Sequence, residues 1–411
     1  MGYFFLKAPH SSSPRVASTS GVRSKSAEAP GATTMPAGET SKVRAPALPA
    51  RNASSVQPPN PVVPRANTPL QRTDPTSYLR QLLPGLTNLD FGREPITREQ
   101  AAQLKQGLQA LAAQGAAAVP AIRQFLEQNV DLSFGKEGAE SAGAASLRVG
   151  LLDVLRQIGG PEALALSRQV LQTTTEPLEI ALLARNLEEA APGQYRQEFL
   201  DAARGTLGTI IQGQMTNVDV GPLFQALQTY GGAGVADDLE KMAPNWNYYA
   251  MIALAELPSG QGVPSLVRLA QDPAGFETGQ YKLAFQMLAQ MSPQFPEASA
   301  SLLELARQNQ IPDKAWRAIA AGLGGSQYQI ARQLPQNTFP VGSSVEAGRS
   351  DIGGMIQTFY SSPLPDGGSA ANLSQRLTII DQLLQASSTS PAALQALRQA
   401  RARLLGASGG I

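Results

Sequence analysis

One phrase occurs twice in the chain, and this repetition restricts the possible folds more than any other sequence feature. Residues 115–126 (GAAAVPAIRQFL) and 257–273 (LPSGQGVPSLVRLAQDP) both place small residues before Val-Pro, followed by Arg and by apolar residues at helical spacing. Proline suits the first turn of a helix, where its missing N–H would have no partner, so each phrase predicts a helix that starts at Val-Pro. This repetition of a phrase indicates a protein built from helical repeats.

Each of these helices is expected to pair with a helix that precedes it. Residues 97–100 (TREQ) fit a capping box, in which the threonine hydroxyl and the glutamine side chain bond each other's backbone N–H groups. Leu104, Leu108 and Leu111 follow at spacings of four and three, on one face of a helix that should end near Gly115. This helix and the Val-Pro helix after it form the first predicted pair.

Pairs of this kind recur through the middle of the chain, separated by Gly and Pro breaks such as 159–161 (GGP). We expect about seven pairs: 97–114 with 120–126, 147–158 with 162–172, 178–190 with 194–211, 222–230 with 236–242, 246–257 with 263–271, 280–291 with 297–308, and 312–323 with 328–334. A single pair cannot cover its own apolar faces. Neighbouring pairs should therefore stack and share one core.

Composition favours helices over strands and excludes several kinds of catalysis. The apolar residues are mostly Ala and Leu, and aromatic residues make up only 6% of the chain, so we expect an all-α protein. The chain has no cysteine and a single histidine, His10, which lies outside the helical repeats. Thiol catalysis, cysteine or histidine metal sites and histidine-based triads are thereby excluded from the repeats, and we expect no cofactor, no metal and no enzyme activity.

The repeated phrase has a counterpart in a known family. At 119–122 (VPAI) and 263–266 (VPSL) the chain resembles bacterial HEAT repeats of the short, phycobilisome-lyase-like type, whose second helix opens with Val-Pro-x-Leu after a glycine-bearing turn. The resemblance covers residues 95–335 and implies a stacked α–α superhelix, an armadillo-like α-solenoid, that binds protein; it transfers no catalytic residue. Outside the two matching repeats only helix pairing supports it, and tetratricopeptide-like or irregular helix pairs would satisfy that pairing too.

Composition divides the chain into four segments. Residues 1–75 form a Ser-, Pro- and Ala-rich leader that we expect to be disordered, with nine Lys or Arg against three Asp or Glu, whereas the rest of the chain has 24 against 29. We expect the solenoid over 76–340, a flexible linker over 341–370, and a C-terminal helical hairpin over 371–411 with Ser390 as a helix cap. The basic leader is interpreted as a solubilising tail, and nucleic acid is not the expected partner.

The first residues leave the location of the protein open. Residues 1–6 (MGYFFL) are apolar and precede Lys7, but they are too few for a membrane span or for the core of a signal peptide. Aromatic residues followed by lysine are typical of the far end of a membrane anchor. The sequence as it stands indicates a cytoplasmic protein, whereas a start site upstream would supply a membrane tether facing the cell envelope.

Three aromatic residues within four positions form the candidate partner-binding site. Trp246, Tyr248 and Tyr249 cannot all face the same way, because successive helix positions differ by about 100 degrees. Trp246 and Tyr249 lie three positions apart and are expected to face the core, which leaves Tyr248 as the residue that faces solvent. Trp and Tyr are also the residues that protein interfaces favour, so binding and core packing are both considered.

Three further clusters have simple structural interpretations. The acidic run 237–240 (DDLE) opens a predicted helix, where carboxylates complement the helix dipole, so we interpret it as a helix start and not as a metal or paired-carboxylate site. Arg398, Arg401 and Arg403 lie near a helix end, which favours cations, with nucleic-acid binding as the weaker alternative. The segment 231–234 (GGAG) lacks the Lys-Ser/Thr of a phosphate loop and is expected to be a turn.

The leading functional hypothesis is a non-enzymatic scaffold that binds one or more proteins through a HEAT-like solenoid carried on the leader. Two alternatives stay open at this point. One is an enzyme on the same fold that acts on a glycan through a pair of carboxylates, and the other is a nucleic-acid-associated protein that uses the basic leader. No motif in the sequence identifies the partner or the biological process.

Overall fold

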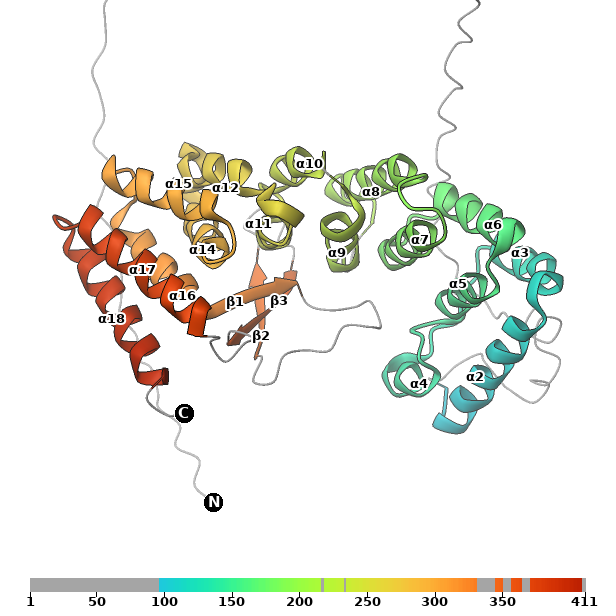
Figure 1. The fold of residues 1–411 in the computed structure, drawn as a ribbon. Coiled ribbons are helices and arrows are strands. Elements are labelled where there is room, and N and C mark those ends of the chain that lie inside the picture. Colours follow the sequence, from blue (N-terminus) through green and yellow to red (C-terminus); the bar gives the residue numbers. More distant parts are fainter. Residues whose placement is uncertain are drawn as a thin grey trace, which may run out of the picture. The chain divides into compact units, whose positions relative to one another are not determined.

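The protein is mostly helical over the part of the chain that the structure describes. The computed structural model describes residues 96–215, 218–232, 234–330, 344–349, 356–363 and 370–408. Within these ranges lie seventeen α-helices, three short 3-10 helices and one three-stranded sheet (Figure 1). The predictions for the leader (1–75) and for residues 1–6 fall outside them. None of the helices in the described ranges is both long and apolar enough to span a bilayer.

The helices follow one another along the chain with short breaks. Their bounds are α2 (Arg98–Ala113), η1 (Gly115–Ala118), α3 (Val119–Glu127), α4 (Gly135–Ala142), α5 (Leu147–Ile158), α6 (Gly160–Thr173), α7 (Pro177–Ala190), α8 (Arg196–Ile211), α9 (Gly221–Tyr230), α10 (Val235–Met242), α11 (Asn247–Ala255), η2 (Pro258–Gly260), α12 (Val263–Gln271), α13 (Pro273–Thr278), α14 (Tyr281–Met291), α15 (Pro296–Arg307), η3 (Asp313–Ala315), α16 (Trp316–Leu323), α17 (Ala370–Ala386) and α18 (Pro391–Ser408). Most of these helices lie where the sequence predicts them, within a few residues at each end.

Capping chemistry explains the predicted helix starts. The Thr97 hydroxyl accepts a hydrogen bond from the N–H of Gln100 at 3.2 Å, and the Gln100 side chain accepts one from the N–H of Thr97 at 2.8 Å, so the predicted capping box of α2 is confirmed. At the start of α5 the Ser146 hydroxyl accepts from the N–H of Val149 at 3.4 Å. These side chains satisfy backbone donors that a helix leaves unpaired in its first turn.

Both Val-Pro phrases open helices, α3 and α12, with proline in the first turn. In the second phrase the preceding glycine is required by space, because a Cβ on Gly262 would lie 2.0 Å from the carbonyl oxygen of Leu254 in α11. Gly234 holds the corresponding position before α10, but there a Cβ would meet nothing within 4 Å. The missing side chain of Gly262 therefore permits the close approach of α11 and α12.

The helices form two rows. In the first row α2, α5, α7, α9, α11, α14 and α16 each contact the next. In the second row α3 contacts α6, α6 contacts α8, α10 contacts α12, and α12 contacts α15 (Figure 1). The buried apolar side chains of both rows belong to one continuous cluster, so the pairs share a core as the sequence pattern predicts.

Ion pairs join neighbouring helices of the second row. An arginine pairs with a carboxylate of the next helix in three successive steps, with N–O distances from 2.5 to 2.9 Å: Arg168 with Glu198, Arg204 with Asp238, and Arg268 with Glu240. The acidic run 237–240 does open α10, as predicted, and its three carboxylates also pair with arginines of the helices on either side. Because the arginines are exposed, each pair contributes only about 0–1 kcal/mol.

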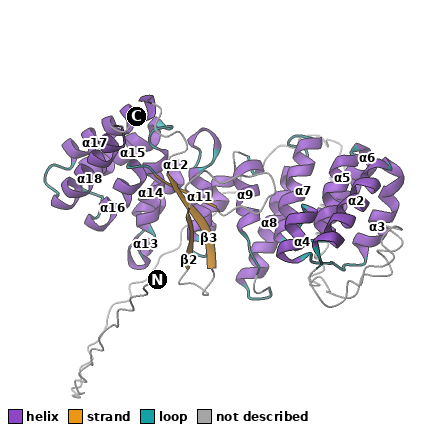
Figure 2. Ribbon diagram, turned by 90° about the horizontal axis from the view of Figure 1, so that it is seen from below, coloured by secondary structure: helices purple, strands orange, loops and turns teal. Residues whose placement is uncertain are grey.

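A three-stranded antiparallel sheet corrects three predictions. Its strands are β1 (Ser326–Ile330), β2 (Ser344–Arg349) and β3 (Ile356–Pro363), in the order β1-β3-β2. The helix expected at 328–334 is wrong over residues 328–330, which are the part of it that the structure describes and which belong to β1. The linker expected at 341–370 contains two strands, and the fold is not purely α-helical. The sheet contacts α9, α11 and α16, and both ribbon views place it beside α11 (Figures 1 and 2).

Side-chain amides attach this sheet to the helices, which gives the physical reason for the wrong prediction. Gln290 of α14 accepts from the N–H of Tyr328 at 2.8 Å and donates to the carbonyl oxygen of the same residue at 3.2 Å, as a neighbouring strand would. Gln357 of β3 is fully buried and accepts from the N–H of Tyr249 in α11 at 3.0 Å. These contacts join residues far apart in the chain, so the local sequence of β1 (SQYQI) does not encode them.

Two helices, α17 and α18, follow the sheet where the sequence predicts a hairpin, and they extend both rows. α17 contacts α15, and α18 contacts α16. The predicted cap of α18 is present, since the Ser390 hydroxyl accepts from the N–H of Ala393 at 3.2 Å. Arg376 of α17 is buried and donates to the carbonyl oxygens of Gly322 and Leu323 at the end of α16, at 2.9 and 3.1 Å. A cation thus stabilises the negative end of the α16 dipole.

Candidate functional site

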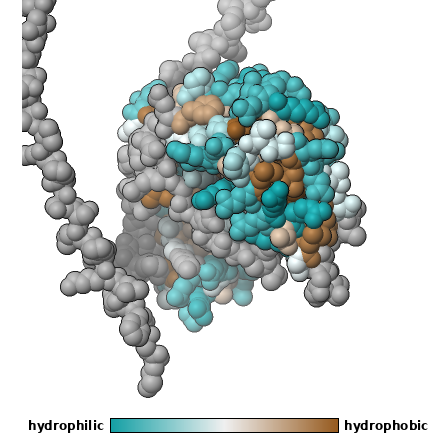
Figure 3. Space-filling view, turned by 90° about the vertical axis from the view of Figure 1, so that its left-hand side faces the viewer, coloured by the Kyte–Doolittle hydropathy of each residue, from teal (hydrophilic) through white to brown (hydrophobic). Residues whose placement is uncertain are grey.

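The last helices of the described chain border a groove of about 850 Å³. Its walls are η3 with α16 on one side and α18 on the other, and Lys282 at the start of α14 adds to the lining. The walls run in the same direction, because Ser390 before α18 bonds Asp313 of η3 at 3.2 Å while Ala400 lies beside Gly324, which follows α16. Figure 3 looks onto the side of the molecule where these helices lie, and apolar patches (brown) interrupt its hydrophilic surface.

Alanines form the floor of the groove. Ala392, Ala396 and Ala400 recur at every fourth position of α18, so they lie on one face of this helix, the face toward α16. The six lining alanines are Ala318, Ala320, Ala321, Ala392, Ala396 and Ala400. Ala320, Ala396 and Ala400 are buried and the other three are partly exposed. The small side chains leave an apolar base along which another segment could lie close to both helices.

Four cations surround this floor. Lys282, Lys314, Arg317 and Arg403 are exposed, and over the described ranges none of them has a carboxylate oxygen within 4.0 Å of its charged nitrogen atoms. The lining contains one carboxylate, Asp313, which accepts a hydrogen bond from the Ser390 hydroxyl at 3.2 Å. The groove therefore has an excess of positive charge, and we refer to it as the basic groove.

An exposed aromatic residue lies next to the basic groove. Phe276 of α13 is 41% exposed and stacks on Tyr281, with ring centroids 4.6 Å apart. The ammonium group of Lys282, a residue of the groove lining, lies 5.8 Å from the centroid of the same Tyr281 ring. Aromatic side chains are enriched at protein interfaces, so an exposed aromatic ring at this position is compatible with a binding surface.

The predicted aromatic cluster lies elsewhere, at the start of α11, where Tyr248 and Tyr249 contact β3. Trp246 and Tyr249 are 2% and 1% exposed, so their predicted orientation toward the core is confirmed. Tyr248 is half-buried and stacks on Phe359 of β3, with centroids 4.5 Å apart and an interplanar angle of 10°. The expectation that Tyr248 faces solvent is therefore met only in part, because β3 covers one face of its ring. A partner-binding role for these three residues stays a prediction.

The Tyr249 hydroxyl joins three segments of the chain. It donates to the carboxylate of Asp219 at 3.2 Å and accepts from the N–H of Thr358 in β3 at 2.9 Å. Burial and the neighbouring Asp219 carboxylate raise the pKa of Tyr249 well above its usual range, so the phenol stays protonated at neutral pH. This residue has a structural role, since it ties α11 to the sheet and to the segment before α9.

The three arginines predicted to form a patch on the last helix have different surroundings. Arg401 pairs with Asp381 of α17 at 2.8 Å, which fastens the two helices together. Arg403 lines the basic groove, whereas Arg398 is exposed and does not belong to the lining. Only one member of the predicted patch therefore contributes to the candidate site.

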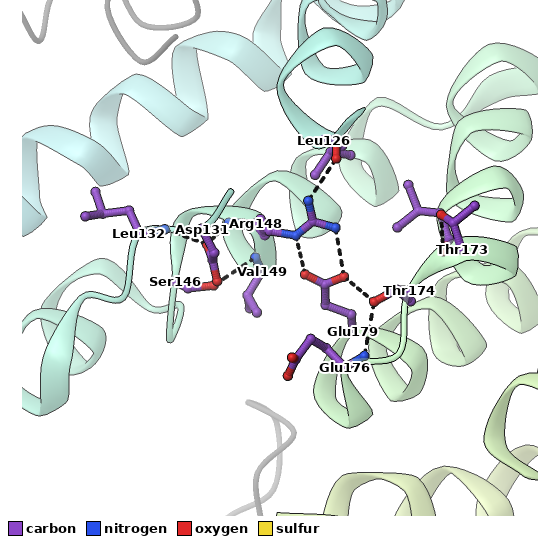
Figure 4. Close-up of polar contacts among 11 residues, drawn as sticks. Leu126, Asp131, Leu132, Ser146, Arg148, Val149, Thr173, Thr174, Glu176 and Glu179 are labelled. Carbon is purple, nitrogen blue, oxygen red and sulfur yellow. Dashed lines mark hydrogen bonds and ion pairs between the residues drawn. The ribbon is translucent and has the colours of Figure 1, made fainter. Parts of the chain in front are cut away.

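A buried polar network at the other end of the described chain has a structural role (Figure 4). The Arg148 guanidinium donates to the Glu179 carboxylate at 2.6 and 3.0 Å and to the Leu126 carbonyl oxygen at 2.9 Å. The Thr174 hydroxyl donates to the same carboxylate at 2.7 Å, and Asp131 accepts from the backbone N–H of Arg148 at 3.0 Å. Burial raises the pKa of Asp131. These groups satisfy one another, so the network joins α3, α5 and α7 without requiring a ligand.

The sequence does not reveal the basic groove, because its cations belong to separate elements. Lys282, Lys314 and Arg317 stand in α14, η3 and α16, and each looks like an ordinary surface residue in the sequence. The one local signal is the alanine at every fourth position of α18. Over the described ranges no three His, Cys, Asp or Glu side chains gather as a metal site would require. No family model, no curated protein and no solved structure matches the chain.

Proposed function

We propose that the chain is a non-enzymatic protein–protein interaction scaffold with the architecture of a HEAT-like α-solenoid. The two rows of helices support this architecture, since successive units contact one another and α17 and α18 extend both rows. In such a stack each unit contacts only its neighbours, and the long surfaces that result are used to bind other proteins.

The observation that carries the proposal is the basic groove. Its four cations have no carboxylate partner in the described ranges, whereas Arg168, Arg204 and Arg268 of the second row are all paired. An apolar base with a charged, exposed rim is the usual arrangement of a protein-binding patch. Four cations without a carboxylate partner thus gather around one apolar floor, whereas these three arginines of the second row are used in pairs between helices.

A single introduced thiol can test whether a protein binds there, because the chain has no cysteine of its own. Gln399→Cys places the thiol in the groove lining, and Gln109→Cys places it at an exposed position of α2 as the matched control. Each full-length variant is labelled with a maleimide photo-crosslinker, mixed with an extract of the source cells and illuminated.

We expect Gln399→Cys to give a discrete protein adduct that survives nuclease treatment and that mass spectrometry identifies in repeated experiments. Gln109→Cys should not give the same adduct. The proposal fails if the groove position gives no specific protein adduct, if both positions give the same products, or if nuclease removes the adduct.

A further inference from the structure

We propose that the basic groove binds an acidic amphipathic helix of the partner protein. This inference rests on the proposed function and specifies the chemistry of the segment that the scaffold recognises. The helix would place an apolar stripe on the alanine floor and its Glu or Asp residues against the cations of the rim.

Charge complementarity selects an acidic partner. Lys314 and Arg317 stand on one wall, Arg403 on the other, and Lys282 at the start of the neighbouring α14. Asp313 is the one carboxylate in the lining, and it already bonds Ser390. Complementary charge steers association and rejects partners of the wrong sign, so a neutral or basic segment would be disfavoured.

The shape of the floor favours a helix. The lining residues of α18 run from Ala392 to Arg403, about three helical turns or roughly 16 Å along the axis. Alanines at the base let a third helix approach α16 and α18 to the interaxial distances of about 8–10 Å that packed helices adopt. A partner helix of three to four turns would match this length and would cover the apolar floor on one face.

The same lining disfavours nucleic acid. Single-stranded nucleic acid is held by aromatic side chains that stack on successive bases. The lining residues of the groove include no aromatic ring, and Phe276 beside it already stacks on Tyr281 with one face. The apolar alanine floor offers a phosphate backbone no hydrogen-bond donor, whereas it can pack against the apolar stripe of a helix. The leader of the chain itself is also a poor occupant, because its charge is positive like that of the groove.

An unbiased selection tests the inference. A display library of helical 14-residue peptides with random surface positions is selected against the full-length protein, and the enriched peptides are sequenced and measured by fluorescence anisotropy. We expect the enriched peptides to be strongly acidic with an apolar stripe, and to bind more weakly as the salt concentration rises. A polyphosphate and a single-stranded oligonucleotide serve as competing probes.

Two matched variants on α18 locate the binding. Arg403→Glu reverses a charge in the groove lining, and Arg398→Glu reverses an exposed charge on the same helix outside it. The first should weaken peptide binding about tenfold or more, while the second should leave it nearly unchanged. Circular dichroism shows whether both variants keep the wild-type helix content.

The outcomes separate this inference from the proposed function. If the enriched peptides are neutral or basic and bind Arg403→Glu more weakly than wild type, the partner segment is not an acidic helix. The groove would still bind protein, so the proposed function would stand. Enriched peptides that bind both variants equally, or a selection that enriches none, would overturn the inference at this site. Displacement of every peptide by polyphosphate or oligonucleotide at much lower concentration would replace the acidic helix with a polyanion site.

Discussion

At the scale of single residues, buried charges are the groups on which stability depends most. Arg148 and Glu179 are 3% and 2% exposed and bind each other, and Arg148 also donates to the Leu126 carbonyl oxygen in the network between α3, α5 and α7. A buried pair contributes little relative to a well-packed apolar pair, but removing one partner leaves an uncompensated charge. The sequence does not predict this network, because an arginine and a glutamate in two different helices look the same whether buried or exposed.

Replacing Arg148 should therefore be far more damaging than replacing an exposed arginine of similar contacts. We expect Arg148→Met to reduce the free energy of unfolding by about 3–5 kcal/mol. The control Arg168→Met removes a half-exposed pair with Glu198 and should cost about 0–1 kcal/mol. Urea denaturation followed by circular dichroism measures both, and equal losses in the two variants would contradict the structural role of the network.

The titration of Asp131 gives a prediction with a defined sign. Burial raises the pKa of Asp131 above its ordinary value of 3.8, so the folded state binds this proton more tightly than the unfolded state does. The contribution of Asp131 to stability therefore falls as the pH rises from about 3.8 through the raised folded value. Asp131→Asn keeps an oxygen that can accept from the N–H groups of Leu132 and Arg148 but does not titrate.

Measured as the free energy of unfolding, the stability of the wild type relative to Asp131→Asn should decrease across this acid range and then level off. Denaturation with urea between about pH 3.5 and 7 gives the comparison, and other titrating groups cancel because both proteins carry them. A difference that grows with pH, or that stays constant, would contradict the raised pKa.

At the scale of elements, helix ends follow from local chemistry and the sheet does not. The capping residues Thr97, Ser146 and Ser390 act within their own first turns, so the sequence predicts α2, α5 and α18 closely. β1 depends on Gln290, and β3 depends on residues of α11. Since these contacts span distant parts of the chain, the strands could not be predicted from periodicity.

The glycine before the second Val-Pro phrase has a role that one substitution can test. Gly262→Ala would place a methyl group 2.0 Å from the Leu254 carbonyl oxygen, so we expect a loss of about 1–3 kcal/mol in the free energy of unfolding. Gly234→Ala, at the corresponding N-cap position before α10, meets nothing within 4 Å and should cost only the N-cap preference for glycine over alanine, about 0.5–1 kcal/mol. Thermal melting of both variants measures the difference, and equal melting temperatures would refute this explanation.

Attachment of the sheet to α11 is expected to depend on Gln357. Gln357→Leu removes the acceptor for the Tyr249 N–H and the donor to the Asn247 side-chain oxygen. A buried polar group left without a hydrogen bond costs about 1–3 kcal/mol in the free energy of unfolding. Hydrogen exchange should rise over β3 and the start of α11, while α2 to α7 keep their protection. The control Gln329→Leu alters a half-buried glutamine of β1 and should leave exchange over β3 unchanged. Exchange over β3 that is identical in the Gln357 variant and wild type would contradict this role.

At the scale of the whole molecule, the periodic pattern predicts the succession of helix pairs but not the surface on which they act. The shared core follows from apolar faces that recur along the chain. The basic groove depends on how η3, α16 and α18 come together after the intervening sheet, and its cations are spread over many residues of sequence. The aromatic cluster that the sequence singles out lies largely in the core, while the groove uses lysine, arginine and alanine, which carry no distinctive motif.

A charge-swap experiment on the captured partner tests the central claim most directly. The binding affinity of the full-length protein for the partner that Gln399→Cys captures is measured by isothermal titration calorimetry, first with wild type and then with Arg317→Glu. We predict that Arg317→Glu weakens binding about tenfold or more, and that exchanging the facing partner carboxylate for arginine restores much of the loss. Unchanged affinity in Arg317→Glu would contradict binding at the basic groove.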